Sequence, residues 1–290
     1  MLILAATPLG NPLDASQSLK DAIVMAKFIA AEDSRKFSRL CSDLGISHNA
    51  KVISFFEGNE SDRIGELSEL LKSGEDLLVV TDAGMPGVSD PGYRLVRAAI
   101  NNEIAVKVLP GPSAVTTALL LSGLPTDRFV FEGFAPRSSG ARTSWFEDLM
   151  EEERTIIYFE APHRIEESLS DAIKVLGANR QAAICRELTK TYEEVVRGTL
   201  AELLDWAKSK EVLGEITVVL SGFSAEKINI ESGDLVRQVL QIEAAGLSRK
   251  DAIAEVAKEN QIAKRTVFKD RKSTRLNSSH SQQSRMPSSA

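Results

Sequence analysis

Acidic and small residues crowd one short stretch of the chain, VVTDAGMPGVSDPG at residues 79–92. It holds Asp82, Asp90, three glycines and two prolines, and it follows an apolar run. A loop that binds phosphate offers backbone N–H groups and keeps carboxylates away. Proline removes such a donor and aspartate repels phosphate, so the composition argues against a phosphate site. It favours a ligand with hydroxyl groups or a positive charge, unless the loop is only a tight turn in which Asp90 caps the next helix.

Two further loops of similar character follow apolar strands. TPLGN at 7–11 comes after the first strand of the chain, and PGPSA at 110–114 comes after another, with Ser113 placed to cap a helix. The carboxyl ends of parallel strands lie at one edge of an open α/β sheet, where ligands bind. We therefore expect the three loops to converge on a pocket of acids, small residues and apolar walls. Such a pocket fits a nucleoside with a cationic group, which describes S-adenosylmethionine.

Charged residues gather in four other segments, AAEDSRKFSRL (30–40), FFEGNE (55–60), YFEAPHRI (158–165) and CRELTKTYEE (185–194). Taken singly, each is typical of a solvated helix end or loop. Taken together, Arg, His and Lys in turns at one sheet edge could contact an RNA backbone. The sequence contains no nucleophilic triad, metal-ligand cluster or phosphate-binding Walker motif.

Composition limits the class of protein. The chain has 290 residues and is 43% hydrophobic, enough for one large or two medium domains. Cys41 and Cys185 show no pairing pattern, and the N-terminus reads as a buried strand and not as a signal peptide, so we expect a soluble cytoplasmic protein without membrane contact. The net charge is −6, and it falls to −10 without the four basic residues of 271–290. RNA binding would therefore depend on a local basic patch.

The elements that position these loops alternate between strand and helix, which predicts an α/β fold with a parallel sheet covered on both faces. In the first half we predict strands at 1–7, 51–56, 76–81 and 104–109, and helices at 15–33, 61–74 with Ser61 as N-cap, 93–102 and 113–123. In the second half we predict strands at 128–136, 154–162, 180–188 and 214–223, with helices at 164–177 and 199–209.

The same pattern divides the chain into parts. We expect α/β domains at 1–112 and 113–223, a linker at 224–234, and a small helical unit at 235–269. Residues 270–290 are rich in serine and lack periodicity, and the stretch DRKSTRLNSSH at 270–280 resembles a translated sequencing adapter. We therefore interpret 270–290 as a non-native or disordered tail.

Eight motifs in their order resemble the tetrapyrrole-methylase superfamily, and within it the rRNA small subunit methyltransferase I family. They are ATPLGNPLD, AEDSRKFSRL, FEGNE, TDAGMPGVSDPGYRLV, PGPSAVTTALLLSGL, YFEAPHRI, CRELTKTYEEVVRGTL and GEITVVL. The resemblance covers residues 2–222, and 235–269 weakly. Ser34, Met85 and Ala161 depart from the usual motif residues without changing the class.

The resemblance implies two α/β domains with S-adenosylmethionine in the cleft between them, and a homodimer. It implies 2′-O-methylation of a decoding-centre cytidine of bacterial 16S rRNA, within the small ribosomal subunit. It implies cofactor contacts from Pro8, Asp82, Ala83, Gly84, Val88, Ser113, Ala114, Tyr158 and Leu188. The residues that it implies for the RNA side are Arg35, Asn59, Glu60, His163, Arg164, Arg186 and Lys190.

A ribose 2′-hydroxyl is a weak nucleophile, so its methylation needs in-line alignment and help in removing the proton. Glu187, Lys190, Asp33 and His163 are the candidate acid/base groups, and the sequence does not choose among them. The alternatives are a methyltransferase of the same fold that acts on a tetrapyrrole or a protein side chain, and a nucleoside-binding regulatory module without catalysis.

Overall fold

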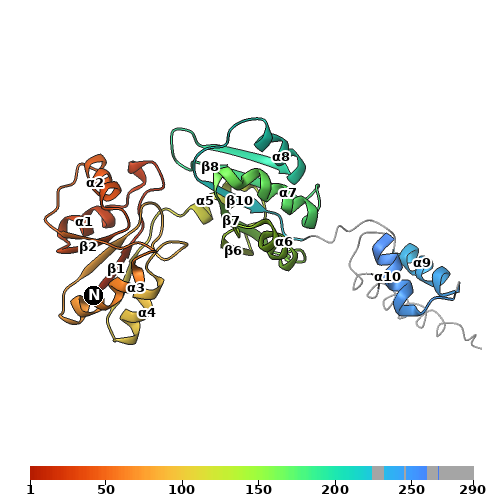
Figure 1. Cartoon of the computed structure of the whole chain (residues 1–290), viewed down its shortest axis with the longest axis horizontal. Helices are drawn as coiled ribbons and strands as arrows, with labels where there is room; N and C mark the ends of the chain where they lie inside the picture. Colours follow the sequence, from red (N-terminus) through yellow and green to blue (C-terminus); the bar gives the residue numbers. More distant parts are fainter. Residues whose placement is uncertain (224–231, 245, 260–266, 268–290) are drawn as a thin grey trace, which may run out of the picture. The chain divides into compact units, whose positions relative to one another are not determined.

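The structure is a computed structural model that describes residues 1–223, 232–244, 246–259 and 267 (Figure 1). The chain divides into two compact units, Met1–Gly222 and Phe223–Ala290. The first unit contains two sheets of five strands each, and both sheets carry helices. This is the predicted α/β class, with helices following it in the second unit.

The first sheet is entirely parallel, with strand order β3-β2-β4-β1-β5. Its strands are Leu2–Ala5 (β1), Phe28–Ala31 (β2), Lys51–Ser54 (β3), Leu77–Val80 (β4) and Val106–Leu109 (β5). The central strand β4 is buried at every position, as expected for an apolar run in a sheet covered on both faces.

Four helices cover the two faces of this sheet (Figure 1). They are Gln17–Met25 (α1), Ser34–Asp43 (α2), Glu60–Lys72 (α3) and Tyr93–Asn101 (α4). Leu19 of α1 and Phe37 of α2 pack on one face, and Leu67 of α3 and Leu95 of α4 pack on the other. The alternating side chains of each strand therefore feed two separate cores, which hold the sheet and its carboxyl edge in place.

The predicted helix over 15–33 is wrong in its second half. The helix α1 ends at Met25, and Phe28–Ala31 form β2 in the interior of the sheet. A short apolar run such as FIAA fits a buried helix or a buried strand, and periodicity does not separate the two. Pairing with β3 on one side and β4 on the other satisfies its backbone groups as a strand.

The second sheet is mixed, with strand order β6-β7-β10-β8-β9. Its strands are Phe129–Phe134 (β6), Thr155–Glu160 (β7), Gln181–Arg186 (β8), Glu194–Thr199 (β9) and Ile216–Leu220 (β10). Only β6 and β7 are parallel, and β10 runs antiparallel to both of its neighbours. The strand β9 was not predicted, because an edge strand with charged residues lacks the apolar run that marks an interior strand.

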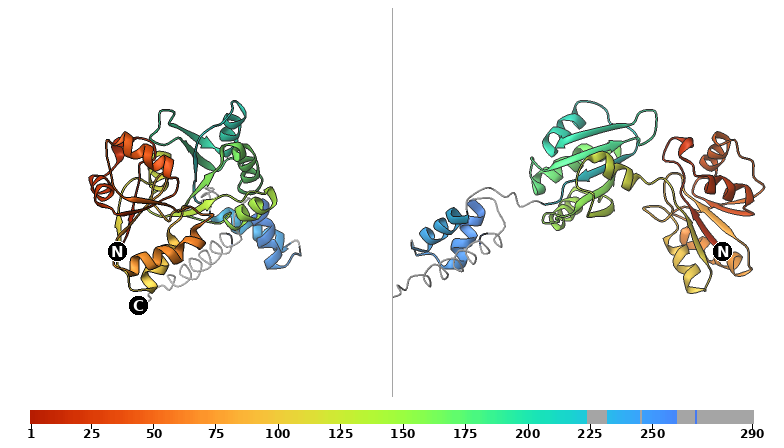
Figure 2. Two further views of the ribbon diagram at one scale, coloured as in Figure 1. Left: turned by 60° about the vertical axis from the view of Figure 1, so that its left-hand side comes forward. Right: turned by 180° about the vertical axis from the view of Figure 1, so that it is seen from behind.

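Helices also cover this sheet on both faces. On one side lie Ser139–Asp148 (α6), Ile165–Leu176 (α7) and Leu200–Lys208 (α8), which share one core (Figure 2). On the other side Ala114–Ser122 (α5) packs against β7, β8 and β10. Leu9 from the loop after β1 joins that second core, so the first half of the unit contributes to it directly.

In its described residues, the second unit contains the helices Ser232–Ala244 (α9) and Arg249–Glu259 (α10), with Leu235, Val239 and Val256 buried in their common core. The helix α9 begins inside the predicted linker 224–234, and the predicted tail 270–290 lies outside the described residues. Among the residues that the structure describes, no helix has both the length and the apolar composition needed to cross a membrane.

Candidate functional site

The loops predicted to converge do so at the carboxyl edge of the first sheet. The loop after β1 meets the loop after β4 in an antiparallel bridge between Thr7 and Gly84, with N–H to carbonyl distances of 2.9 and 3.1 Å. Gly84 has a φ of 82°, a left-handed conformation that glycine adopts without a Cβ penalty. The bridge fixes the acidic loop relative to the first strand.

A second connection joins the ends of β2 and β4. The Glu32 carboxylate accepts the N–H of Asp82 at 3.1 Å, and the Asp82 carboxylate accepts the N–H of Asp33 at 3.1 Å. Lys36 donates from Nζ to Asp82 at 2.8 Å, which raises the pKa of Lys36. Asp33 itself caps α2, and its hydrogen bond from the side chain of Arg35 lowers the pKa of Asp33 to about 2.

A cavity of about 440 Å³ lies between this edge and the second sheet. That volume falls within the roughly 300–1,000 Å³ range of small-molecule sites. Its apolar walls are Leu9, Val88, Val115, Phe134, Phe159 and Ile216. Its charged side chains are Glu32, Asp82, Asp90, Glu215, Glu160 and Lys36. The combination of apolar walls, small residues and carboxylates is the one that the sequence predicted for this edge.

Another cavity, of about 550 Å³, lies near Met1 and Asp76 at the opposite edge of the first sheet. None of the predicted site residues lines it. Ligands of open α/β sheets bind at the carboxyl edge, so we place the site in the smaller cavity.

Asp90 has an unusual position in the site cavity. Burial, together with the charges of Glu32, Asp82 and Glu215, raises the pKa of Asp90 to about 7. The predicted capping role of this residue is wrong: the N-cap of α4 is Gly92, and no side chain bonds to the helix there. Asp90 instead presents to the cavity a carboxyl group that titrates near neutral pH.

Six of the nine residues predicted to bind the cofactor line the cavity, namely Asp82, Ala83, Gly84, Val88, Ser113 and Ala114. Pro8, Tyr158 and Leu188 do not. The side chain of Tyr158 is fully buried with Trp145 and Phe146 in the core under α6–α8. Leu188 packs with Leu9 in the other core of that sheet.

Two of the candidate acid/base groups, Glu187 and Lys190, form an ion pair with a distance of 2.9 Å between Nζ and Oε1. Lys190 also contacts Glu215, a cavity-lining residue, at 3.0 Å. Burial alone would lower the pKa of Lys190, but its hydrogen bonds to Glu187 and Glu215 outweigh burial and raise that pKa. Burial alone would raise the pKa of Glu187, but the hydrogen bonds from Lys190 and from the Glu215 N–H bring it below its usual value. Both groups are therefore charged at neutral pH.

The residues predicted for the RNA side fall into two groups. The side chain of Arg35 is 90% exposed, and His163 is exposed in the short 3-10 turn Pro162–Arg164 (η2). The other five, including Lys190 described above, bind other groups of the protein. Arg164 pairs with Glu160 at 2.6 Å, and Arg186 pairs with Glu194 at 3.1 Å.

Asn59 and Glu60 hold the loops of the first half. The helix α3 begins at Glu60 with Asn59 as N-cap, so the predicted cap at Ser61 is wrong. Glu60 is 7% exposed, and its carboxylate accepts the N–H of Gly92 at 3.0 Å. Asn59 binds the backbone of Phe56 and Ser54.

Sequence reasoning missed several cavity residues. Glu32 and Lys36 lie in the charged segment 30–40, and Glu215 lies in the motif GEITVVL, but nothing in the spacing linked them to Asp82 or Lys190. Phe134 and Phe159 lie on predicted strands without any local sign of a ligand. Among the described residues, no group of three His, Cys, Asp or Glu side chains is arranged to hold a metal ion.

The fold is that of a methylase of the tetrapyrrole type, and residues 1–204 match the family described as Tetrapyrrole (Corrin/Porphyrin) Methylases. Diphthine synthase shares the fold with a TM-score of 0.57 at 18% identity, over 76% of this chain and 89% of that one. Uroporphyrin-III C-methyltransferase from Thermus thermophilus, solved with S-adenyl homocysteine, gives a TM-score of 0.53 at 17% identity, over 76% and 96%. At such identities the likeness shows the fold alone.

Relatives at higher identity identify the branch. The chain belongs to the tetrapyrrole methylase superfamily and, within it, to the family of ribosomal RNA small subunit methyltransferase I. The Mycobacterium tuberculosis H37Rv protein of that name is 51% identical over 256 residues, covering 88% of each chain. The Escherichia coli O157:H7 protein is 36% identical over 270 residues, covering 92% of this chain and 93% of its own.

Proposed function

We propose that this protein transfers a methyl group from S-adenosylmethionine to the ribose 2′-oxygen of a cytidine in the decoding centre of 16S rRNA. The observation that carries the proposal is the cavity at the carboxyl edge of the first sheet, with its carboxylates and apolar walls. The names of the relatives, which specify ribosomal RNA of the small subunit as their substrate, support the choice of RNA.

The residues of the cavity fit the cofactor. Apolar side chains such as Val88 and Phe159 can cover an adenine ring. Carboxylates such as Asp82 can accept hydrogen bonds from ribose hydroxyls, and the other acids offset the positive charge of a sulfonium and an ammonium group. Among the residues that the structure describes, Lys36 is the one lysine or arginine that lines the cavity. It is paired with Asp82, so an anionic diphosphate would fit poorly.

The bound cofactor would supply an electrophilic methyl group, and the protein's task is to align the ribose oxygen with it and exclude water. Alignment of two reactants supplies a large share of such a rate enhancement, about 7–11 kcal/mol in favourable cases. We propose that alignment in the cavity dominates, and that proton removal makes the smaller contribution.

The proton can leave through more than one group. As paired here, Lys190 carries its proton and Glu187 is ionised, so Glu187 is the stronger acceptor of the two. Asp33 is held ionised as a helix cap, and His163 lies exposed on η2. Asp90 joins the four earlier candidates, since a general base works best when its pKa lies near the working pH.

The decisive experiment incubates the protein with methyl-labelled S-adenosylmethionine and purified 30S subunits, then maps the modified ribose by primer extension. We expect label at one cytidine 2′-oxygen of the decoding centre. Free 16S rRNA, a tetrapyrrole and a protein extract serve as parallel acceptors. Label on the tetrapyrrole or on protein, with none on rRNA, would contradict the proposal and identify the other acceptor as the substrate. Cofactor binding without any methyl transfer would favour a regulatory module.

A further inference from the structure

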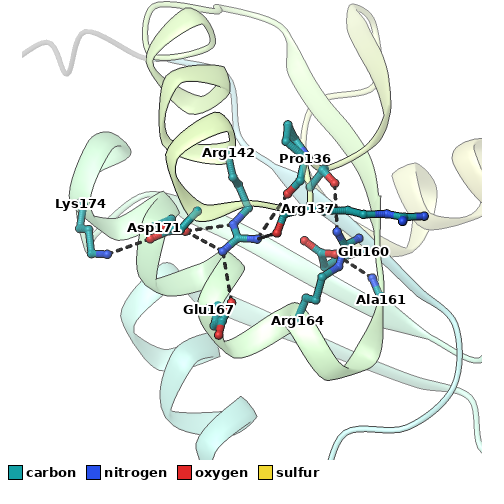
Figure 3. A network of polar contacts seen from close by, with 11 residues as sticks. Pro136, Arg137, Arg142, Glu160, Ala161, Arg164, Glu167, Asp171 and Lys174 are labelled. Atoms are coloured by element: carbon teal, nitrogen blue, oxygen red, sulfur yellow. Dashed lines mark hydrogen bonds and ion pairs between the residues drawn. The ribbon is translucent and has the colours of Figure 1, made fainter.

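One buried arginine clamps the loop between β6 and α6. Arg142 is 0% exposed, and it donates from Nε and Nη2 to Asp171 of α7 at 3.0 and 2.7 Å (Figure 3). Its Nη1 donates to the backbone carbonyls of Pro136 and Arg137, both at 3.3 Å. Ser139 binds the same Asp171 carboxylate at 2.9 Å. A single guanidinium therefore holds two successive peptide groups of the loop against a helix.

A second arginine holds the preceding residue of the same loop. Arg164 of η2 donates to the carbonyl of Ala135 at 3.5 Å, and its guanidinium is anchored by the buried Glu160 at 2.6 Å (Figure 3). Three successive carbonyls, at 135, 136 and 137, are thus fixed by two arginines from different elements.

Folding stability alone does not account for these buried ion pairs. Burying an ion pair carries a desolvation penalty that its attraction often only offsets, and apolar residues in its place are frequently as stable. What the buried forks do provide is a single loop conformation. The loop carries one outward cation, Arg137, whose side chain extends away from the network with no contact drawn to it (Figure 3). It is exposed, and among the described residues no ion pair or side-chain hydrogen bond is recorded for it.

The clamped loop borders the proposed methylation site. Phe134, just before it, and Pro162, just before His163, both line the cavity. Arg137 and His163 therefore lie in the segments that follow the adjacent strands β6 and β7, each within three residues of a cavity residue. The cavity itself is rich in carboxylates, which repel a phosphate backbone, and an RNA strand that reaches it needs cations at the rim.

We propose that Arg137 contacts a backbone phosphate of the RNA substrate at the rim of the cavity, and that Arg142 is its positioning residue. The inference rests on the proposed function and adds a substrate contact to it. Arg137 acts as an exposed charge whose direction is set in advance, so that less order is lost when the RNA binds.

The test measures binding of 30S subunits as a function of salt, together with turnover, for full-length variants. Arg137→Ala should weaken RNA affinity roughly tenfold and reduce the salt slope by about one phosphate contact, with cofactor affinity unchanged. Arg97→Ala is the matched control, because Arg97 is an exposed arginine on α4 that does not line the cavity. It should leave both quantities near wild type.

Conservative replacements separate the two roles. Arg137→Lys should restore most of the affinity, because a phosphate contact needs only a positive charge. Arg142→Lys should weaken the affinity for 30S subunits, because an ammonium lacks the planar fork that reaches Asp171 and two carbonyls at once. The expected signature of Arg142→Lys is a raised KM for 30S subunits with kcat and cofactor affinity near wild type.

Suppose that the wild-type protein methylates rRNA and that Arg137→Ala keeps the wild-type affinity and salt slope. That result would overturn the inference and leave the proposed function standing. If wild type methylates no RNA at all, the proposed function fails first. If Arg142→Lys does not fold, the variants Arg137→Ala and Arg137→Lys, with the control Arg97→Ala, still test the phosphate contact.

Discussion

At the scale of single residues, the state of Asp90 controls the charge of the cavity. Its pKa is raised to about 7 by burial and by the carboxylates of Glu32, Asp82 and Glu215. A folded pKa above the unfolded value means that the group stabilises the fold below about pH 4, and that this stabilisation is lost as the pH rises through about 7. Ionised Asp90 is thus tolerated at a cost, and a cationic ligand would offset that cost.

Cofactor binding should therefore depend on pH. A positive charge near Asp90 favours the carboxylate, so the Kd for S-adenosylmethionine should fall by up to about tenfold between pH 6 and pH 8. Asp90→Asn should flatten this dependence, and S-adenosylhomocysteine, which lacks the sulfonium charge, should show less of it. Calorimetric titration across this range measures both, and an unchanged slope in Asp90→Asn would contradict the assignment.

The same variant, Asp90→Asn, also tests what the ionised carboxylate costs in folding stability. Because Asn carries no charge to desolvate, Asp90→Asn should raise the free energy of unfolding at pH 8 by about 1 kcal/mol, a modest value because solvent reaches part of the side chain. At pH 4 the variant and the wild type should differ little. Urea denaturation at the two pH values measures the difference, and equal gains at both would point to packing instead of charge.

The Glu187–Lys190 pair makes the other residue-scale prediction. Lys190→Ala and Glu187→Ala should each lower turnover by about a factor of 10–100 without abolishing it, because alignment is retained when one proton acceptor is lost. Cofactor binding and 30S binding serve as controls for an intact site. Near-wild-type turnover in both variants would remove the pair from the list of acid/base groups.

At the scale of elements, the site depends on how closely three loops approach one another. Asn11 in the loop after β1 donates its N–H to Thr189 Oγ1 at 3.1 Å, and Thr189 has a left-handed φ of 60°. Gly10 lies so near Lys190 that a Cβ there would collide with Lys190 Cγ and lie 3.0 Å from its backbone nitrogen. Contact between the first half of the unit and the Glu187–Lys190 loop therefore requires glycine at position 10.

Replacing Gly10 tests this contact. Gly10→Ala should destabilise the protein by about 1–3 kcal/mol, because a backbone segment must move to admit the methyl group. Gly65→Ala is the matched control, since a Cβ at Gly65 on α3 meets nothing within 4 Å. That substitution should stabilise the helix by about 0.5–1 kcal/mol. Chemical denaturation of both variants gives the comparison, and a neutral Gly10→Ala would show that the loops separate freely.

At the scale of the whole molecule, the described residues that line the cavity belong to the first compact unit. The helices α9 and α10 enclose their own small core. Assembly into a homodimer stays a prediction from the family resemblance.

A chain that ends after Phe223 should fold and bind S-adenosylmethionine with a Kd within about twofold of the full chain, because the first unit has its own cores and contains the described residues that line the cavity. Calorimetric titration of the shortened and full chains gives the ratio. A loss of affinity beyond tenfold would mean that the second unit supports the cavity.

The order of the motifs was enough to indicate the family, the fold class and the edge of the sheet where the cavity lies. This works because glycine, proline and acid spacings in βα loops are local, and because parallel strands necessarily end together. Local patterns did not predict the strands β2 and β9. The β2 segment FIAA has no distinctive period, and the edge strand β9 carries charged residues.

The tertiary structure alone decided which polar groups meet. Glu32 accepts the N–H of Asp82, 50 residues further along the chain, and the Asp82 carboxylate accepts the N–H of Asp33. Lys190, in the loop between β8 and β9, contacts Glu215 just before β10. Such pairings depend on distances of a few ångströms between distant segments, and no spacing along the chain encodes them. For the same reason, the sequence suggested that Asp90 caps a helix. Its pKa is raised to about 7 only because the fold buries it and places three other acids around it.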